Sequence, residues 1–347
     1  MKERKLNIEF MRIVAILSTI VIHVSNIYIR SFGKISNGAF FTGAFFNACA
    51  RICVPIFFMI SGALLIPGEY KKEKYLKRIR KFVIILAVWS VIYFLINVYR
   101  GGDANVVKAI ARTFFDTTYT SKHLWFMYAI IGIYICLPFV QSMCKNLTKE
   151  QENLFLILWL GLCGMSVIYL PLARALGGRN IDIEYPIPII NAAYYLGYFV
   201  SGHILYQRLN KVKANKKYNF WCVFTLFVTI ALITIVTYIA SVKYGKLVNG
   251  MLWYRSIFII LESFALFILI ITNEDKFKDK WIGDVASLSF GVYLVHAIIL
   301  FIIKDNIDMI SYPPIVFIPV FSIIIFVASL LIAFIMKKIP VIKNLIG

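Results

Sequence analysis

Long apolar stretches alternate with short polar loops along almost the whole chain. Each stretch is about 20 residues long, which is the length an α-helix needs to cross the hydrocarbon core of a bilayer. We therefore predict ten transmembrane helices, at residues 10–29, 43–66, 82–99, 124–143, 153–173, 188–207, 218–241, 251–272, 283–303 and 313–336. The alternation that a membrane β-barrel needs is missing, so we expect an all-α membrane protein.

The composition favours one membrane domain over residues 1–347. Hydrophobic residues make up 61% of the chain and charged residues 16%, whereas a soluble domain is about 45–50% apolar. No polar stretch is long enough for a soluble domain. Because no small-residue cleavage site follows the basic N-terminus, we expect a retained first helix and not a signal peptide.

The basic residues predict how the helices are oriented. Of the 37 Lys and Arg residues, 23 lie at the termini and in the loops of one side, and 11 lie in the loops of the other side. The positive-inside rule makes the richer side cytoplasmic, so both termini are expected inside the cell. The net charge of +20 then suits contact with anionic lipid, and without a soluble basic module we expect no nucleic-acid partner.

Three loops are unusually long or charged. The cytoplasmic loop 67–81 holds the densest basic cluster, and loops 100–123 and 174–187 are the longest on the outer side. The six cysteines lie within or at the edge of apolar spans and lack the spacing of a metal site. We therefore expect neither disulfide bonds nor a bound metal.

The first helix carries polar residues that a lipid-facing helix would not hold. Arg12 and His23 are eleven residues apart, so they share a helix face and are offset by about 16 Å along the axis. Glu9 lies one turn before Arg12, and Asn26 one turn beyond His23. This stripe should face the protein interior or a wet cavity. The alternatives are a snorkelling Glu9–Arg12 pair and a helix–helix hydrogen bond from His23.

These residues resemble a known family. The segment NIEFMRIVAILSTIVIH is similar to the first helix of the acyltransferase 3 membrane proteins, which has an acid, an arginine three residues later and a histidine eleven residues after that. Five further segments resemble the family in the same order: RICVPIFFMISGALL, YLKRIRKFVIILAVWS, HLWFMYAIIGIYICLPFV, YLGYFVSGHIL and LSFGVYLVHAIIL. The chain departs from the family where Lys81 follows Arg78, since two arginines are usual there, and where Glu9 replaces the commoner Asp.

The resemblance implies an integral-membrane O-acyltransferase in the cell membrane, which moves an acyl group onto a hydroxyl of a cell-envelope saccharide or glycopolymer. The expected donor is an acyl-CoA, usually acetyl-CoA, which acts as a co-substrate, and no resident cofactor is expected. Without an appended hydrolase-like domain, the membrane part would act alone or with a partner.

The chemistry assigns a role to each candidate residue. His23 would be the general base, because its unperturbed pKa of about 6.5 lies near the working pH. Arg12, backed by Glu9, would orient or bind the donor. Cations near the cytoplasmic mouth would bind the CoA phosphates, and these are Lys77, Arg78, Arg80 and Lys81.

A second group of residues is expected near the acceptor. His23, Arg51 and His296 all lie roughly 9–12 Å below the outer surface, and Asn26 continues the stripe. Arg51 would hold the acceptor or an oxyanion; alternatively, it pairs with Glu262 for packing. Side chains that we interpret as structural or interfacial are His123, His203, Tyr194 and Tyr195. Alternatively, His203 lines the CoA entry, and Tyr194 and Tyr195 stack on a sugar.

Two other functions fit the same helices. A transporter or exporter of a sugar or glycolipid would also need buried charges. A non-catalytic subunit of an envelope-synthesis complex is the third alternative, and it explains the buried histidine poorly. A CoA-binding site on the inner face would distinguish the enzyme from a transporter of neutral sugar.

Overall fold

The computed structural model describes residues 5–115, 122–165, 192–340 and 342–346. Within these residues it contains helices and no strand, so the predicted all-α membrane fold is confirmed. Eight helical segments are long and apolar enough to cross a membrane. They are α1 (Leu6–Arg30), α2 with α3 (Asn37–Ala50 and Cys53–Leu65), α4 (Lys72–Tyr99), η1 with α6 (Lys122–Leu124 and Trp125–Asn146), α10 (Lys216–Tyr244), η3 with α11 (Gly250–Leu252 and Ile257–Ile271), α13 (Ser289–Asn306) and α14 (Pro314–Lys338).

The other two predicted spans border the part of the chain that is not described. The span predicted at 153–173 corresponds to α7 (Lys149–Trp159), which continues as a π-helix, η2 (Leu160–Gly164). The span predicted at 188–207 corresponds to α9 (Ala192–Leu209). Residues 166–191, which include the predicted outer loop 174–187, lie outside the described residues.

Several short helices connect or follow the spans. They are α5 (Val106–Phe115), η4 (Glu274–Lys276), α12 (Lys280–Ala286), η5 (Met309–Ser311) and η6 (Ile342–Leu345). The predicted outer loop 100–123 therefore contains a short helix, α5, which is not among the candidate membrane spans. This helix begins where the Asn105 side chain accepts a hydrogen bond from the backbone N–H of Lys108 at 2.9 Å, which is a typical helix N-cap.

Helix α4 begins ten residues earlier than the apolar pattern predicts. The basic cluster that we placed in a loop lies instead on its first turns, because Lys72 to Lys81 is rich in strong helix formers such as Lys, Arg, Glu and Leu. The cations of this cluster are thereby held at fixed angles around one helix.

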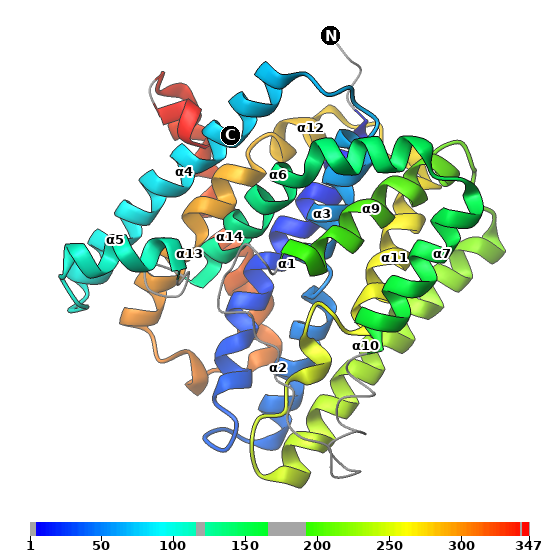
Figure 1. Ribbon diagram of the computed structural model, residues 1–347. Coiled ribbons are helices and arrows are strands. Elements are labelled where there is room, and N and C mark those ends of the chain that lie inside the picture. Colours follow the sequence, from blue (N-terminus) through cyan, green and yellow to red (C-terminus); the bar gives the residue numbers. More distant parts are fainter. Residues whose placement is uncertain (1–4, 116–121, 166–191, 341, 347) are drawn as a thin grey trace, which may run out of the picture.

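Helix α1 is the centre of the bundle. It packs against α2, α3, α11, α12, α13 and α14, and runs through the middle of the molecule in Figure 1. One hydrophobic core lies mainly between α1, α3, α6, α9 and α11, and a second between α1, α4, α6, α13 and α14. The polar stripe of α1 is therefore enclosed by protein over much of its length, as the cost of polar groups in lipid requires.

The loops predicted on the basic side gather at one end of the bundle, which we call the basic end. Lys5, just before α1, donates a hydrogen bond to the Tyr206 hydroxyl near the end of α9. Asn219 at the start of α10 exchanges hydrogen bonds with Asn273 after α11. That the basic end faces the cytoplasm stays a prediction from the loop charges.

Candidate functional site

At the basic end, the predicted pair on α1 is formed. The Arg12 guanidinium donates from Nη1 to both carboxylate oxygens of Glu9, at 3.0 and 3.1 Å. The two residues are one helical turn apart, where opposite charges meet. Both side chains are partly exposed, so Arg12 keeps further N–H groups for a ligand.

Arg78 is the member of the basic cluster on α4 that turns toward the bundle. Its guanidinium carbon lies 5.5 Å from the centroid of the Tyr134 ring on α6. Tyr134 also interacts with Ser61 on α3 and is within electrostatic reach of Arg12. The side chains of Lys77, Arg80 and Lys81 are exposed. One arginine thus lies against this tyrosine and a second, from another helix, is within electrostatic reach of it; we call Arg12, Arg78 and Tyr134 the basic mouth.

Farther along α1, three histidines form one group, the histidine cluster. The ring centroid of His23 lies 5.2 Å from that of His296 on α13 and 6.4 Å from that of His123 in η1. His123 and His296 are themselves 5.2 Å apart. His23 is partly exposed, whereas His123 and His296 are 4% and 0% exposed. His23 is thus the imidazole that a substrate can reach.

Two tyrosines hold this cluster in place. The Tyr93 hydroxyl on α4 donates to the backbone oxygen of Leu294 at 2.6 Å, and its ring lies 4.7 Å from His123. The Tyr293 hydroxyl on α13 donates to the backbone oxygen of His123 at 2.7 Å. These bonds join α4, η1 and α13 around the imidazoles.

The tautomer of His296 follows from its hydrogen bond. Its Nδ1 lies 3.2 Å from the carbonyl oxygen of Val292. A carbonyl oxygen only accepts, so Nδ1 carries the proton and Nε2 carries a lone pair. Nε2 is buried and has no hydrogen-bond partner among the described residues. His296 therefore brings an unused acceptor into the cluster.

Arg51 lies at a break in the second span, between α2 and α3. Pro55 has no N–H and cannot donate to the Arg51 carbonyl four residues earlier, so the helix opens at Arg51 and Ile52. The Arg51 Nε donates to Asn47 Oδ1 at 2.8 Å. Asn47 in turn donates to Ser25 Oγ at 2.9 Å and to Asn26 Oδ1 at 3.2 Å on α1. Arg51 is thereby tied to the polar stripe that carries His23.

The comparison with known families decides the identity of the fold. The chain matches the model of an acyltransferase domain over residues 5–336, nearly its whole length. It belongs to the acyltransferase 3 family. No match was found among curated proteins or among solved structures. The chain is thus an acyltransferase and a multi-pass membrane protein.

In this acyltransferase, the alternative pairing of Arg51 with Glu262 is not formed. Glu262 on α11 is buried, and its Oε2 has no hydrogen-bond partner among the described residues. Arg51 uses Asn47 instead, and its guanidinium carbon lies 5.5 Å from the Tyr254 ring. The two terminal nitrogens of Arg51 make no hydrogen bond to any described residue, so they are available to a substrate.

The structure places several predicted residues differently from the sequence. His123 was predicted as an interfacial anchor, but it is buried in the histidine cluster because η1 packs between α4 and α13. Tyr195 was also interpreted as an interfacial anchor, but its ring stacks on Phe58 at 4.9 Å in the bundle interior. His203 is buried on α9 and stays apart from the histidine cluster.

The sequence analysis missed Asn47, Tyr93, Trp125 and Tyr254. Asn47 could have been found, since it precedes Arg51 by four residues on a helix. The other three depend on which helices are neighbours. Among the described residues, no group of three or more His, Cys, Asp or Glu side chains is arranged to hold a metal ion.

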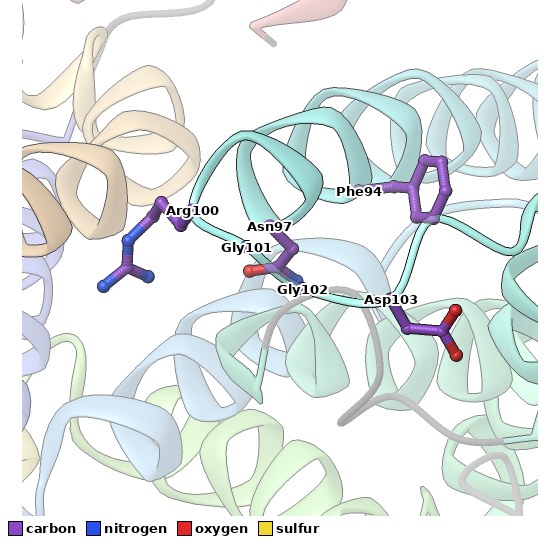
Figure 2. Close-up of a pocket in the computed structure, with 6 residues that line it drawn as sticks. All are labelled: Phe94, Asn97, Arg100, Gly101, Gly102 and Asp103. Atoms are coloured by element: carbon purple, nitrogen blue, oxygen red, sulfur yellow. The ribbon is translucent and has the colours of Figure 1, made fainter.

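A cavity of about 340 Å³ lies at the end of α4 away from the basic end, beside the glycine turn that precedes α5. In Figure 2 the side chains of Phe94, Asn97 and Asp103 lie along this turn, while Arg100 points away from Asp103. Arg100 donates to both carboxylate oxygens of Asp305, and these bonds raise the pKa of its guanidinium. Asp103 pairs with Lys108 at 2.8 Å. The charged residues at this cavity are paired with Asp305 and Lys108, and none of the reactive groups described above lines it.

Proposed function

We propose that this acyltransferase is an O-acetyltransferase of the cell membrane, which moves the acetyl group of acetyl-CoA onto a hydroxyl of a cell-envelope saccharide or glycopolymer. The observation that carries this proposal is the arrangement of α1. One partly exposed imidazole shares a helix face with an arginine at the basic mouth, and Arg51 is hydrogen-bonded to the same stripe.

The basic mouth supports the binding of a CoA donor. Arg78 lies against Tyr134 and Arg12 on α1 is within electrostatic reach of it, and guanidinium groups suit the oxygens of phosphates. The exposed side chains of Lys77, Arg80 and Lys81 would raise the local concentration of the anionic donor without fixing its position. The pantetheine arm would then run along α1 toward His23, about 16 Å away along the axis.

His23 would act as the general base of the transfer. It takes the proton of the acceptor hydroxyl while the hydroxyl oxygen attacks the thioester carbonyl carbon. The carbonyl oxygen becomes an oxyanion, which the free N–H groups of Arg51 stabilise. The carbon–sulfur bond then breaks, and the CoA thiolate takes the proton from the imidazolium. The acceptor leaves as an ester and the donor as free CoA.

The other members of the site would support these steps. His296 and Asn26 lie beside His23 and Arg51, where an acceptor hydroxyl would be held. Glu9 would keep the Arg12 guanidinium in position. His123 would complete the wall behind His23.

The test is transfer of label from [¹⁴C]acetyl-CoA in membranes that contain the wild-type chain or His23→Gln. We expect wild-type membranes to form a product whose label is released by mild alkali, as from an ester. His23→Gln should lower the transfer rate by about 10²–10⁴-fold, the contribution of a general base. His203→Gln is the matched control, because His203 is buried but outside the cluster.

Two results would overturn the proposal. Transfer by His23→Gln at the wild-type rate would remove His23 as the base. Wild-type membranes that form no labelled ester, while the purified chain binds no acetyl-CoA, would instead favour a transporter or exporter of a sugar or glycolipid.

A further inference from the structure

Three aromatic side chains from separate elements meet at the start of α6, which follows His123 in the chain. We call Trp125, Tyr195 and Tyr254 the aromatic cluster. The Trp125 ring lies 5.3 Å from Tyr195 and 5.9 Å from Tyr254, with interplanar angles of 35° and 32°. The Tyr195 and Tyr254 rings are 6.3 Å apart. Trp125 begins α6 two residues after His123, so the aromatic cluster and the histidine cluster are neighbours along the chain.

Tyr195 and Tyr254 are each supported by contacts with neighbouring helices. Phe58 stacks on Tyr195 at 4.9 Å with an interplanar angle of 22°. The Tyr198 hydroxyl donates to the backbone oxygen of Tyr254, and the Tyr254 hydroxyl lies 3.6 Å from the sulfur of Cys53. These contacts come from α3, α9 and the turn before α11; α3 and α9 pack against each other and lie side by side in Figure 1. Two of the three rings are therefore held in place by contacts within the protein.

The aromatic cluster is only partly buried, although it lies among buried helices. Trp125, Tyr195 and Tyr254 all retain some accessible surface. The structure shows no hydrogen bond from the Trp125 indole N–H or from the Tyr195 hydroxyl to any described residue. Neither group is among the buried polar atoms that lack a partner, so both are accessible to a ligand.

Arg51 borders the same space with two more unused donors. Its guanidinium carbon lies 5.5 Å from the Tyr254 ring, and only its Nε is bonded, to Asn47. The combination is a set of aromatic faces together with N–H and O–H donors. A lipid chain would use the faces and leave the donors unpaired, which is costly in a desolvated site. A small anion would use the donors and leave the faces uncovered.

We propose that the aromatic cluster is the platform that binds a sugar ring of the acceptor, and that it sets the choice of acceptor. A pyranose ring has an apolar C–H face, which packs against aromatic rings, and an edge of hydroxyl oxygens, which accept hydrogen bonds from Arg51, Trp125 and Tyr195. The ring would thereby bring one hydroxyl to His23. This proposal rests on the proposed function, because it assumes that the chain transfers an acyl group to a saccharide.

The test compares two substitutions at one position. Trp125→Phe keeps an aromatic face, whereas Trp125→Leu keeps apolar bulk and removes the face. The control is Trp221→Leu, because Trp221 on α10 is 54% exposed and lies outside the aromatic cluster. For each purified variant we would measure binding of [¹⁴C]acetyl-CoA, and in membranes we would measure transfer of label to the native acceptor.

We expect Trp125→Leu to lower transfer by about tenfold or more, which is the size of effect that loss of one aromatic contact produces. Its binding of acetyl-CoA should stay within about twofold of wild type, because the donor site is at the basic mouth. Trp125→Phe should keep transfer within about threefold. Tyr195→Phe, which removes only a hydroxyl, should raise the KM for the acceptor and leave kcat nearly unchanged.

The possible outcomes separate this proposal from the proposed function. Equal transfer by Trp125→Leu and Trp221→Leu would overturn the aromatic platform and leave the acetyltransferase intact. Label found in a lipid and not in a carbohydrate would also overturn the platform. If the wild-type chain binds acetyl-CoA but labels nothing, the proposed function itself fails, and the platform fails with it.

Discussion

The glycine of the Ser61–Gly62 pair allows α3 and α9 to approach each other closely, and Gly62→Ala tests this contact. A Cβ added at Gly62 would lie 1.7 Å from the backbone oxygen of Phe199, whereas ordinary contact begins at 3.4 Å. The two helices would have to separate by the difference between these distances, about 1.7 Å. The atom that must move is backbone in the middle of a helix, so no side-chain rotation relieves the clash.

The expected loss of stability is large for a single methyl group. Overpacking a well-packed interface costs typically about 1–3 kcal/mol, and the backbone clash places Gly62→Ala at the upper end of that range. We expect the midpoint of thermal unfolding in detergent to fall by roughly 5 °C. Gly202→Ala should behave alike, because its Cβ would lie 2.2 Å from the backbone oxygen of Met59 on α3.

The same change should weaken donor binding. Ser61 interacts with Tyr134, and Tyr134 lies beneath Arg78 in the basic mouth. Moving α3 away from α9 would shift Ser61 and lower the affinity for acetyl-CoA. The control is Gly38→Ala, since a Cβ at Gly38 would meet nothing within 4 Å. If Gly62→Ala unfolds within about 1 °C of both wild type and Gly38→Ala, the close helix contact is not the reason for a glycine at this position.

Three further predictions concern the site. Pro55→Ala restores the N–H that can bond to the Arg51 carbonyl, so the helix should become continuous at Arg51. Transfer of the acetyl group should then fall while acetyl-CoA binding persists. Pro319→Ala in α14 is the control, and equal transfer by both variants would refute this reasoning. Asn47→Ala releases Arg51 from α1. It should lower the kcat of transfer by about tenfold, which is the usual effect of losing one buried hydrogen bond to a charged group. An unchanged kcat would show that Arg51 needs no such support. Arg78→Ala should weaken acetyl-CoA binding by about tenfold, but Lys81→Ala by less than about threefold, because only Arg78 is held against Tyr134. If calorimetry shows equal losses of affinity for the two variants, the basic mouth is not the donor-binding site.

Much of the site could be predicted because it lies along one helix. The geometry of an α-helix places residues three and eleven positions apart on one face, so the Glu9–Arg12 pair and the alignment of His23 followed from spacing alone. The depth of a residue below the membrane surface follows from counting along the span. That count brought His23 and His296 to one level, and their rings are 5.2 Å apart.

Other features could not be predicted because they depend on contacts between helices. Whether His123 lies at the interface or beside His23 depends on how η1 packs against α4 and α13. Trp125 and Tyr254 are 129 residues apart in the sequence. Only the packing of α6 against the turn before α11 brings their ring centroids within 5.9 Å of each other. Apolar periodicity carries no information on such neighbours, because a buried face and a lipid-facing face are both apolar.

The sequence by itself determined that the chain is built of helices long and apolar enough to cross a membrane, and which residues share a face of each helix. These properties are local, since a helix satisfies its own backbone hydrogen bonds in lipid whatever lies beside it. The tertiary structure alone decided which faces meet, including the three histidines, the break at Arg51 and the contact at Gly62. In a bilayer the hydrophobic effect does not select a partner for a helix, so close packing of small residues and a few polar contacts make that choice.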